Sequence, residues 1–349
     1  MSMVLSCPLN RRLVAALDEV SVASDGCSAD VAGTRLVGDD PRDLRGRLAN
    51  VLYELLHSGT TGANGRALSA SEELNRDPGF EQQFAEAVPH ADAPVEGLLV
   101  AAGDKELIVR TALITVRVPR DRLVGADVPA PGSAVQLRLD AARPALSPGF
   151  FYVLGSRSRL RRNPAVRRIF VHLTEPGGAV RVWRAALAEL ESARADYHAK
   201  ILSVRADYPR RDALVIYLHG ESSPVEAALV QRLRGDCALG AATSVLTQRL
   251  APGIAAAWEP VDARPGQQNL SFGQHRCFAL AKALVGHALD PVAGSRVQRV
   301  VAEFRLAGID PLRPDRNLQQ DTNMHELATI VAAPPSSGER STGSGQPIR

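Results

Sequence analysis

Lysine is nearly absent from this 349-residue chain, which has only Lys105, Lys200 and Lys282 among its 41 basic residues. The other 38 basic residues are arginines, aromatic residues make up 4% of the sequence, and the formal net charge is +3. A nucleic-acid-binding protein usually has a strong basic excess, often with aromatic side chains for stacking. The composition therefore argues against nucleic acid as a partner, and a module that uses the arginines of 157–168 is the weakest alternative.

Cysteine is also scarce. The four cysteines, at positions 7, 27, 237 and 277, form neither a CxxC pair nor a metal-ligand spacing. Scattered free cysteines suit a reducing cytosol. The first 20 residues lack the apolar core of a signal peptide, and no apolar run reaches the roughly 20 residues that span a bilayer. These features predict a cytoplasmic protein without a membrane partner.

Several motifs of known chemistry are missing as well. The sequence has no GxGxxG or P-loop pattern for nucleotide phosphates, no GxSxG elbow and no HExxH zinc motif. Its eight histidines form no cluster with metal-ligand spacing. We therefore expect neither a metal nor another cofactor.

Changes in hydrophobic pattern divide the chain into segments. The Ser-, Asp- and Gly-rich stretch at 22–40 predicts a loose loop, and Asp40 followed by Pro41 predicts the start of a helix. The predicted domains are a loose N-terminal segment at 1–40, a helical region with a small β-rich subdomain at 41–145, an α+β domain at 146–330 and a disordered tail at 331–349.

Periodicity also predicts the individual elements. Helices are expected at 41–58, 77–87, 180–192, 225–233, 274–289 and 296–306. Strands are expected at 98–100, 107–109, 113–116, 135–137, 150–155, 169–173, 201–204 and 214–218, with a turn at 176–178. This order predicts the α+β class, with a helical N-terminal region and a mixed or antiparallel sheet in the C-terminal domain.

Lys200 is the most informative residue, because it lies in the apolar run 197–204, which otherwise resembles a core strand. In a chain that uses arginine for its surface cations, a retained lysine raises a chemical question. An amine can lose its proton when it is partly desolvated, whereas a guanidinium cannot. The alternative is a lysine at a strand edge that extends its ammonium group to water.

Arg168 and His172 belong to a second candidate group. Arg168 opens an apolar strand, and alternation places Arg168, Phe170 and His172 on one face. Arginine pairs well with phosphate oxygens, so Arg168 is a candidate phosphate ligand. The neighbouring arginines of 157–162 are expected to belong to a solvated loop.

His275 and Arg276 follow Ser271, a helix cap, and Gly273, which breaks the preceding extended segment. Both then lie in the first turn of a helix, where a cation opposes the helix dipole unless an anion offsets it. A phosphate would satisfy Arg276 and the free N–H groups of the helix start. The alternative is that His275 packs in the core and Arg276 pairs with a carboxylate.

The charged segment 207–212 lies between two predicted strands. It is expected to be a charged hairpin, with support of a site as the alternative, and Arg211 is a further candidate phosphate ligand. A lysine, two histidines and several arginines, without metal or nucleotide motifs, are compatible with β-elimination of phosphate from phosphoserine or phosphothreonine. In that reaction a neutral lysine removes the Cα proton, arginines hold the phosphate and a histidine protonates the leaving oxygen.

The sequence also resembles the HopA family of type III secreted effectors and their actinobacterial relatives over about residues 41–316. The resemblance is carried by SPGFFYVLG at 147–155, RIFVHL at 168–173, the Lys200 strand, YPRRDA at 208–213, LAPG at 250–253, SFGQHRC at 271–277 and AGID at 307–310. The helix at 51–59 is similar to the family's N-terminal helix, though less specifically.

This resemblance implies a function as well as a fold. Family members that are not effectors are lyases of class V lanthipeptide and thioamide-peptide biosynthesis. There a separate aminoglycoside-phosphotransferase-like kinase phosphorylates a precursor peptide, the lyase forms dehydroalanine or dehydrobutyrine, and a cyclase subunit is a further partner. The resemblance implies that Lys200 is the base and that Arg168, His275 and Arg276 surround the phosphate.

In the resulting hypothesis Arg249 also neutralises the phosphate, and His275 is the general acid, with His172 as the alternative. The sequence departs from the family at Gln248, where a cation is expected, and Arg249 is the candidate substitute. A degenerate lyase, a non-catalytic scaffold that binds the leader peptide or the kinase, and an effector that acts on a host protein are the alternatives.

Overall fold

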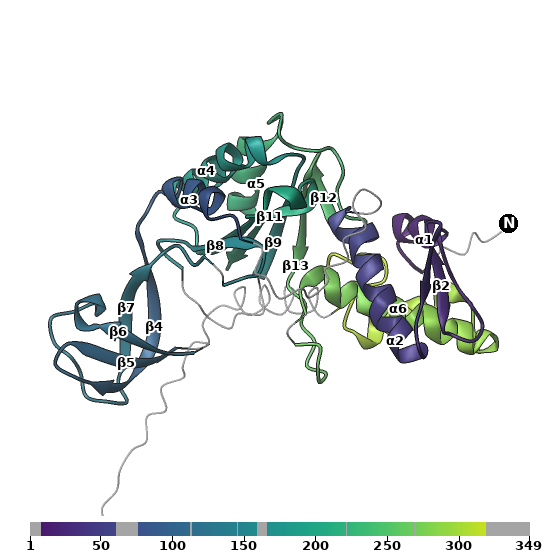
Figure 1. The fold of residues 1–349 in the computed structure, drawn as a ribbon, viewed down its shortest axis with the longest axis horizontal. Helices are drawn as coiled ribbons and strands as arrows, with labels where there is room; N and C mark the ends of the chain where they lie inside the picture. Colours follow the sequence, from purple (N-terminus) through teal and green to yellow (C-terminus); the bar gives the residue numbers. More distant parts are fainter. Residues whose placement is uncertain are drawn as a thin grey trace, which may run out of the picture. The chain divides into compact units, whose positions relative to one another are not determined.

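The computed structural model describes residues 8–60, 76–111, 114–144, 146–158, 166–220, 222–268 and 270–318 (Figure 1). As the sequence predicts, the fold is of the α+β class, with helices and three separate antiparallel sheets in the described ranges. In these ranges, no helix has the length and apolar character that crossing a bilayer requires. The predicted tail at 331–349 lies outside the described residues.

The central element is a six-stranded sheet in which every neighbouring pair is antiparallel. Its strands are β8 (Phe150–Leu154), β9 (Val166–Leu173), β10 (Tyr197–Leu202), β11 (Arg210–His219), β12 (Gln248–Ala251) and β13 (Ile254–Trp258). They lie in the order β12-β13-β9-β11-β10-β8, so β9 and β11 occupy the middle. The middle strands are almost entirely buried, because both faces of the sheet are covered.

One face of this sheet packs in an apolar core with three helices. They are α3 (Pro78–Glu86), α4 (Pro176–Ser192) and α5 (Ser223–Leu233). Ile169 and Val171 of β9 share this core with Trp183 of α4 and Phe84 of α3. The predicted turn at 176–178 is instead the first turn of α4. Proline is tolerated at the start of a helix, and Gly178 leaves room for Ala238, which would lie 2.2 Å from an added Cβ.

The other face packs against a second group of helices. They are α2 (Pro41–Leu52), its π-helical continuation η1 (Tyr53–Ser58), α6 (Phe272–Leu289) and α7 (Arg296–Leu306). Phe170 of β9 and Val215 of β11 share a core with Leu52, Leu56 and Phe272 of these helices. The predicted boundaries hold: Asp40 caps α2, Gly59 ends η1 in the left-handed conformation, and Ser271 forms a capping box with Gln274.

The prediction of a loose loop at 22–40 was wrong for residues 28–37, while residues 1–7 lie outside the described part. Helix α1 (Arg11–Leu17) is followed by the sheet β1 (Val20–Val22), β2 (Ser28–Val31) and β3 (Thr34–Val37). Asp25 and Asp30 accept hydrogen bonds from backbone N–H groups within the two turns. The polar residues that suggested a linker therefore form turns between very short strands, a common use of aspartate.

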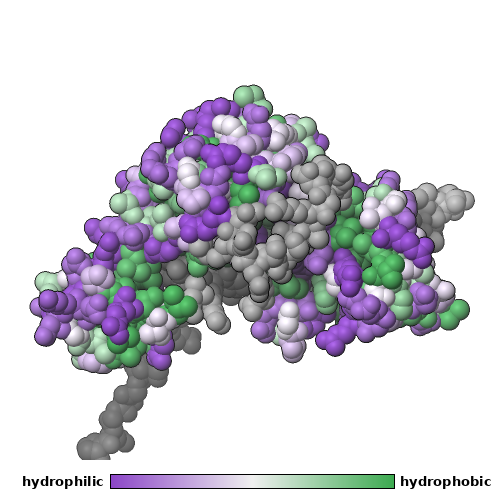
Figure 2. Space-filling model, in the orientation of Figure 1, coloured by the Kyte–Doolittle hydropathy of each residue, from purple (hydrophilic) through white to green (hydrophobic). Residues whose placement is uncertain are grey.

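A four-stranded sheet lies between α3 and β8 in the sequence, as the period-two pattern predicts. Its strands are β4 (Asp92–Ala102), β5 (Glu106–Thr111), β6 (Thr115–Pro119) and β7 (Ala134–Asp140), in the order β6-β5-β4-β7. Figure 2 shows an apolar area over this sheet, and Leu98 and Val100 of β4 are exposed. The remaining short elements are the 3-10 turns η2 (Arg120–Arg122), η3 (Arg205–Asp207) and η4 (Pro291–Ala293).

Candidate active site

Lys200 lies on the face of the sheet that carries Phe170. In the strand register it is directly opposite Tyr152 of β8 and Val215 of β11, and Val215 is opposite Phe170. The Lys200 Nζ atom is 4.1 Å from the centroid of the Phe150 ring and donates a hydrogen bond of 3.3 Å to the Ser147 hydroxyl. The side chain is only partly exposed, so its amine is held against an aromatic ring rather than extended into water.

Burial lowers the pKa of Lys200 to about 8, and the positive charges of Arg168 and Arg210 act in the same direction. Asp212 and Glu259 oppose this shift. A lysine with such a pKa is neutral in roughly a tenth of molecules at pH 7, compared with about four in ten thousand for an ordinary lysine. The site therefore contains an amine that can accept a proton near neutral pH.

Arg168 ends a row of stacked side chains on this face. Its guanidinium lies 4.8 Å from the centroid of Tyr217, whose ring stacks on His198 at 4.2 Å. The other side of His198 stacks on Tyr152 at 5.5 Å. Two guanidinium nitrogens of Arg168 donate to the two carboxylate oxygens of Glu259. The row thus fixes a cation close enough to Lys200 to depress its pKa.

A second cation, Arg210, also lies near Phe150, with its guanidinium 5.6 Å from the centroid of the ring. It donates two hydrogen bonds of 2.9 Å to Asp212 and one of 3.1 Å to the Tyr53 hydroxyl. Tyr53 in turn donates to Asp212 at 2.7 Å. Although burial alone would raise the pKa of Asp212, Arg210 holds it well below the usual range, so Asp212 stays ionised.

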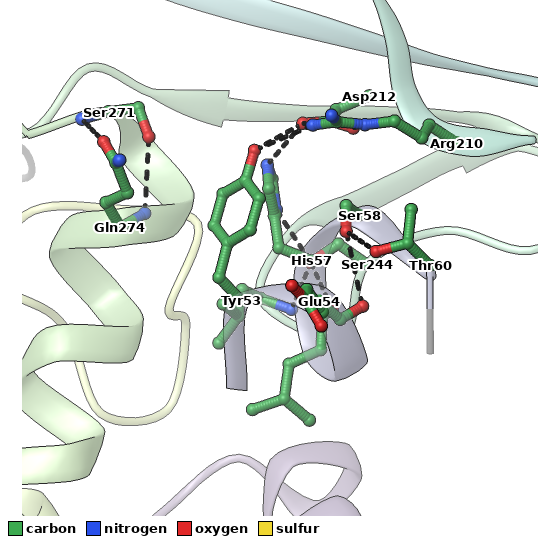
Figure 3. A network of polar contacts seen from close by, with 12 residues as sticks. Tyr53, Glu54, His57, Ser58, Thr60, Arg210, Asp212, Ser244, Ser271 and Gln274 are labelled. Atoms are coloured by element: carbon green, nitrogen blue, oxygen red, sulfur yellow. Dashed lines mark hydrogen bonds and ion pairs between the residues drawn. The ribbon is translucent and has the colours of Figure 1, made fainter. Parts of the chain in front are cut away.

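His57 extends this network toward the helical layer. Figure 3 shows Tyr53 and His57 side by side on η1, with Asp212 and Arg210 beyond them. The His57 Nδ1 atom is 3.2 Å from the Ser244 hydroxyl, and the ring packs edge-on against Phe170 at 5.1 Å. Burial lowers the pKa of His57 to about 4. The neutral imidazole therefore serves as a packed link between η1 and the sheet.

The interpretation of 207–212 as only a charged hairpin was wrong. Arg210 and Asp212 are buried at the start of β11 and bind residues of η1. The physical reason is tertiary, because their partner Tyr53 is 159 positions from Asp212 in the sequence. Strand alternation places Arg210 and Asp212 on one face, which is the one local signal that they act as a pair.

His275 and Arg276 lie at the start of α6, as predicted, but their polar atoms meet protein groups. His275 Nε2 is 2.8 Å from Asp262, and His275 Nδ1 is 3.0 Å from Arg276 Nη1. Arg276 is fully buried and donates to Pro314 O and to Asn317 Oδ1, each at 3.1 Å. Protein oxygens thus take the place of the anion that the sequence suggested beside Arg276.

His172 and Arg211 form another local group. His172 Nδ1 is 3.0 Å from Ala242 O, and its ring packs so closely that a Cβ on Gly240 would lie 2.3 Å from it. Arg211 donates to Leu55 O at 3.1 Å. His172 thus contacts the loop that contains Ala242, and Arg211 contacts η1.

Arg249 is exposed on the edge strand β12. Four strand spacings separate β12 from β10, which corresponds to about 19 Å. Gln248 accepts a hydrogen bond of 2.6 Å from Arg167, and its register with Ala256 and Ile169 places it on the face opposite to Lys200. A polar amide at position 248 therefore leaves the surroundings of Lys200 unchanged.

The structure thus brings Lys200 together with Arg168 and with residues that the sequence analysis did not select. These are Tyr53, His198, Arg210, Asp212, Tyr217 and Glu259. Alternation could have placed His198 beside Lys200, because the two are two residues apart on one strand. Among the described residues, no three His, Cys, Asp or Glu side chains converge as a metal site. The site thus contains an amine with a lowered pKa, two guanidinium groups that act on it, and aromatic rings beside these groups.

Comparisons with known proteins give one family and two solved structures. The HopA1 effector protein family matches residues 141–316. An effector protein from Pseudomonas syringae pv. syringae strain 61 is 15% identical, with a TM-score of 0.38, and the match covers 48% of this chain and 62% of that one. An effector protein from Pseudomonas syringae pv. tomato strain DC3000 is 12% identical, with a TM-score of 0.43, over 78% of this chain and 97% of that one. No curated protein matches the sequence.

Proposed function

The chain belongs to the HopA1 effector protein family, and from this premise we propose that it is a lyase that eliminates phosphate from phosphoserine or phosphothreonine in a peptide. The observation that carries the proposal is the partly buried Lys200 amine beside Phe150, whose pKa is lowered to about 8 by burial and by the charges of Arg168 and Arg210. A general base works best when its pKa lies near the working pH, and Lys200 meets this condition.

The elimination requires one proton transfer and no external reactant. The Lys200 amine takes the Cα proton, the electrons of the Cα–H bond form the Cα=Cβ double bond, and the Cβ–O bond breaks. The phosphate leaves with its bridging oxygen, and the peptide retains dehydroalanine or dehydrobutyrine. Negative charge grows on the phosphate and on the Cα carbanion, so nearby cations stabilise the transition state.

Arg168 is the candidate that best supplies this charge, because it acts on Lys200 electrostatically and lies on the same face. Arg210 is the second. Arg249 is on the far edge of the sheet, and Arg276 is fully buried with its donors bonded to protein oxygens. Arg168 and Arg210 are also paired with carboxylates, but they act electrostatically on Lys200. The same reasoning leaves His275 without a free ring nitrogen to protonate a leaving group.

The proposed reaction needs a phosphorylated peptide, which a separate kinase must supply. Its product is an electrophilic alkene, which a cysteine thiol of the same peptide can attack in a later cyclisation step. The proposed substrate is therefore a phosphorylated precursor peptide, and the family resemblance adds an aminoglycoside-phosphotransferase-like kinase and a cyclase subunit as proposed partners.

A synthetic phosphopeptide with one phosphoserine or phosphothreonine tests the function directly. Incubated without ATP and with excess EDTA, it should lose the mass of phosphoric acid. Lys200→Arg keeps the charge but removes the base, so turnover should fall by about 10²–10⁴-fold. Lys282→Arg is the matched control, because Lys282 forms a partly exposed ion pair of 2.9 Å with Glu303. Wild-type turnover in the Lys200 variant would contradict the role of Lys200 as the base, and a phosphopeptide left unchanged by the wild-type protein would favour a non-catalytic scaffold.

A further inference from the structure

His198 is the histidine that lies beside Lys200, on the same face of the same strand. Its ring is fixed on both sides, at 4.2 Å and 18° by Tyr217 and at 5.5 Å and 25° by Tyr152. Arg168 then covers the outer side of Tyr217. The stacked rings hold the imidazole of His198 in place, although the side chain remains partly exposed.

His219 determines which nitrogen of His198 carries hydrogen. His198 Nδ1 and His219 Nε2 are 3.0 Å apart, so one of them donates to the other. The His219 Nδ1 atom is buried without a partner. Among backbone groups, an orphaned buried N–H is rarer than an under-satisfied acceptor, and we extend this preference to the ring nitrogens. The favoured tautomer therefore leaves the lone pair on His219 Nδ1, and His219 Nε2–H donates to His198 Nδ1.

In this tautomer the remaining hydrogen of His198 is on Nε2. The imidazole is then neutral, and burial together with the positive charge of Arg168 disfavours a second proton. A neutral imidazole is a good hydrogen-bond donor but does not give up its last proton near pH 7. It can therefore stabilise growing negative charge without titrating.

We propose that His198, with its Nε2–H group set by His219 and by the stack, donates a hydrogen bond to the departing phosphate oxygen during elimination at Lys200. The inference rests on the proposed lyase function and identifies the group that stabilises the leaving phosphate. Lys200 receives the Cα proton, phosphate leaves as an anion, and His198 keeps its own proton throughout. This role differs from general acid catalysis by His275 or His172.

The tautomer of His198 can be tested without measuring enzyme activity. In ¹⁵N-resolved NMR spectra of the whole protein, His198 should show hydrogen on Nε2 and an acceptor shift on Nδ1. A spectrum with hydrogen on Nδ1 would overturn the proposal, because Nε2 would then be an acceptor. His219→Leu removes the donor and should change this pattern, while His219→Gln, whose amide can still donate, should preserve it.

Two substrates separate the leaving-group role from the base. A phosphoserine peptide expels phosphate, whereas the same peptide with β-chloroalanine expels chloride, which needs less hydrogen bonding. His198→Phe keeps an aromatic ring in the stack and should lower kcat on the phosphopeptide by about 10²-fold, the usual loss for one such donor. On the chloroalanine peptide its rate should fall less than about tenfold. His287→Gln on α6 is the control and should match wild type on both.

The outcomes distinguish the two proposals. If His198→Phe lowers the rates on both substrates equally, or lowers neither, the proposed role of His198 is overturned. The role of Lys200 as the base is unaffected by that result. If Lys200→Arg is as active as wild type on both peptides, Lys200 is not the base, although the protein is still a lyase. A wild-type enzyme that leaves the phosphopeptide unchanged overturns both proposals.

Discussion

The two faces of the six-stranded sheet are built from alternate residues of the same strands, and both pack in apolar cores, but they hold different charged side chains. On one face Ile169, Val171 and Ile216 join an apolar core with α3 and α4. On the other face Arg168 and Lys200 interrupt the apolar pattern. Burial of side chains on the first, apolar face stabilises the strands. The second, polar face of the same strands can therefore hold charged side chains whose burial is unfavourable by itself.

The largest effect is expected from breaking the buried pair on the polar face. Asp212→Ala leaves Arg210 without its carboxylate, and losing one partner of a buried pair costs about 3–5 kcal/mol. Asp43→Ala is the matched surface control, because its ion pair with Arg47 is exposed to solvent and should contribute little to stability. Urea unfolding of both variants checks the difference. Equal losses would show that the network around Tyr53 adds nothing beyond a surface pair.

A substitution on the apolar face should affect stability without affecting the chemistry. Ile216→Ala removes a fully buried side chain, at a cost of about 2–5 kcal/mol. The pH at which the phosphopeptide reaction reaches half its maximum should stay the same, because Ile216 faces away from Lys200. A shifted pH profile in this variant would mean that the two faces are coupled.

The polar face should also make the protein sensitive to acid. Burial lowers the pKa of both His57 and His275 to about 4, while an unfolded histidine titrates near 6.5. Between these values the unfolded state binds protons that the folded state does not, so stability falls as pH drops from 6.5 toward 4. Each histidine should lower stability at pH 5 by about 2 kcal/mol. The free energy of unfolding of the wild type and of His57→Gln, each at pH 7 and at pH 5, measures this effect. An equal loss of stability in both proteins between pH 7 and pH 5 would contradict the role of His57.

The smallest expected effect is a shift of the activity profile. The reaction should become faster as pH rises through about 8, where Lys200 loses its proton. Arg168→Gln removes a nearby cation and frees Glu259, and both changes raise the pKa of Lys200. The midpoint should move to higher pH, and a shift of one unit would slow the reaction at pH 7 about tenfold. An unmoved midpoint would show that Arg168 does not tune Lys200.

Local sequence patterns were sufficient for most of the architecture. The α+β class, the start of α2 at Asp40, the end of η1 at Gly59 and the cap of α6 at Ser271 agree with the structure. Alternation also placed Lys200 on a strand and Arg168 on the same face as Phe170. These features depend on residues only a few positions apart, which is the range over which backbone preferences and periodicity act.

Tertiary structure decided which of the polar residues meet. Tyr53 binds Asp212 across 159 positions, and His198 joins the stack through strands β8 and β11. Arg276, which the sequence suggested as a phosphate ligand, is a buried group that binds backbone oxygens near 314–317 in the folded protein. Sequence alone could propose the base, because the scarcity of lysine and a strand pattern are local facts. The partners that set its charge could come only from the pairing of distant segments, since a pKa depends on what lies nearby in space.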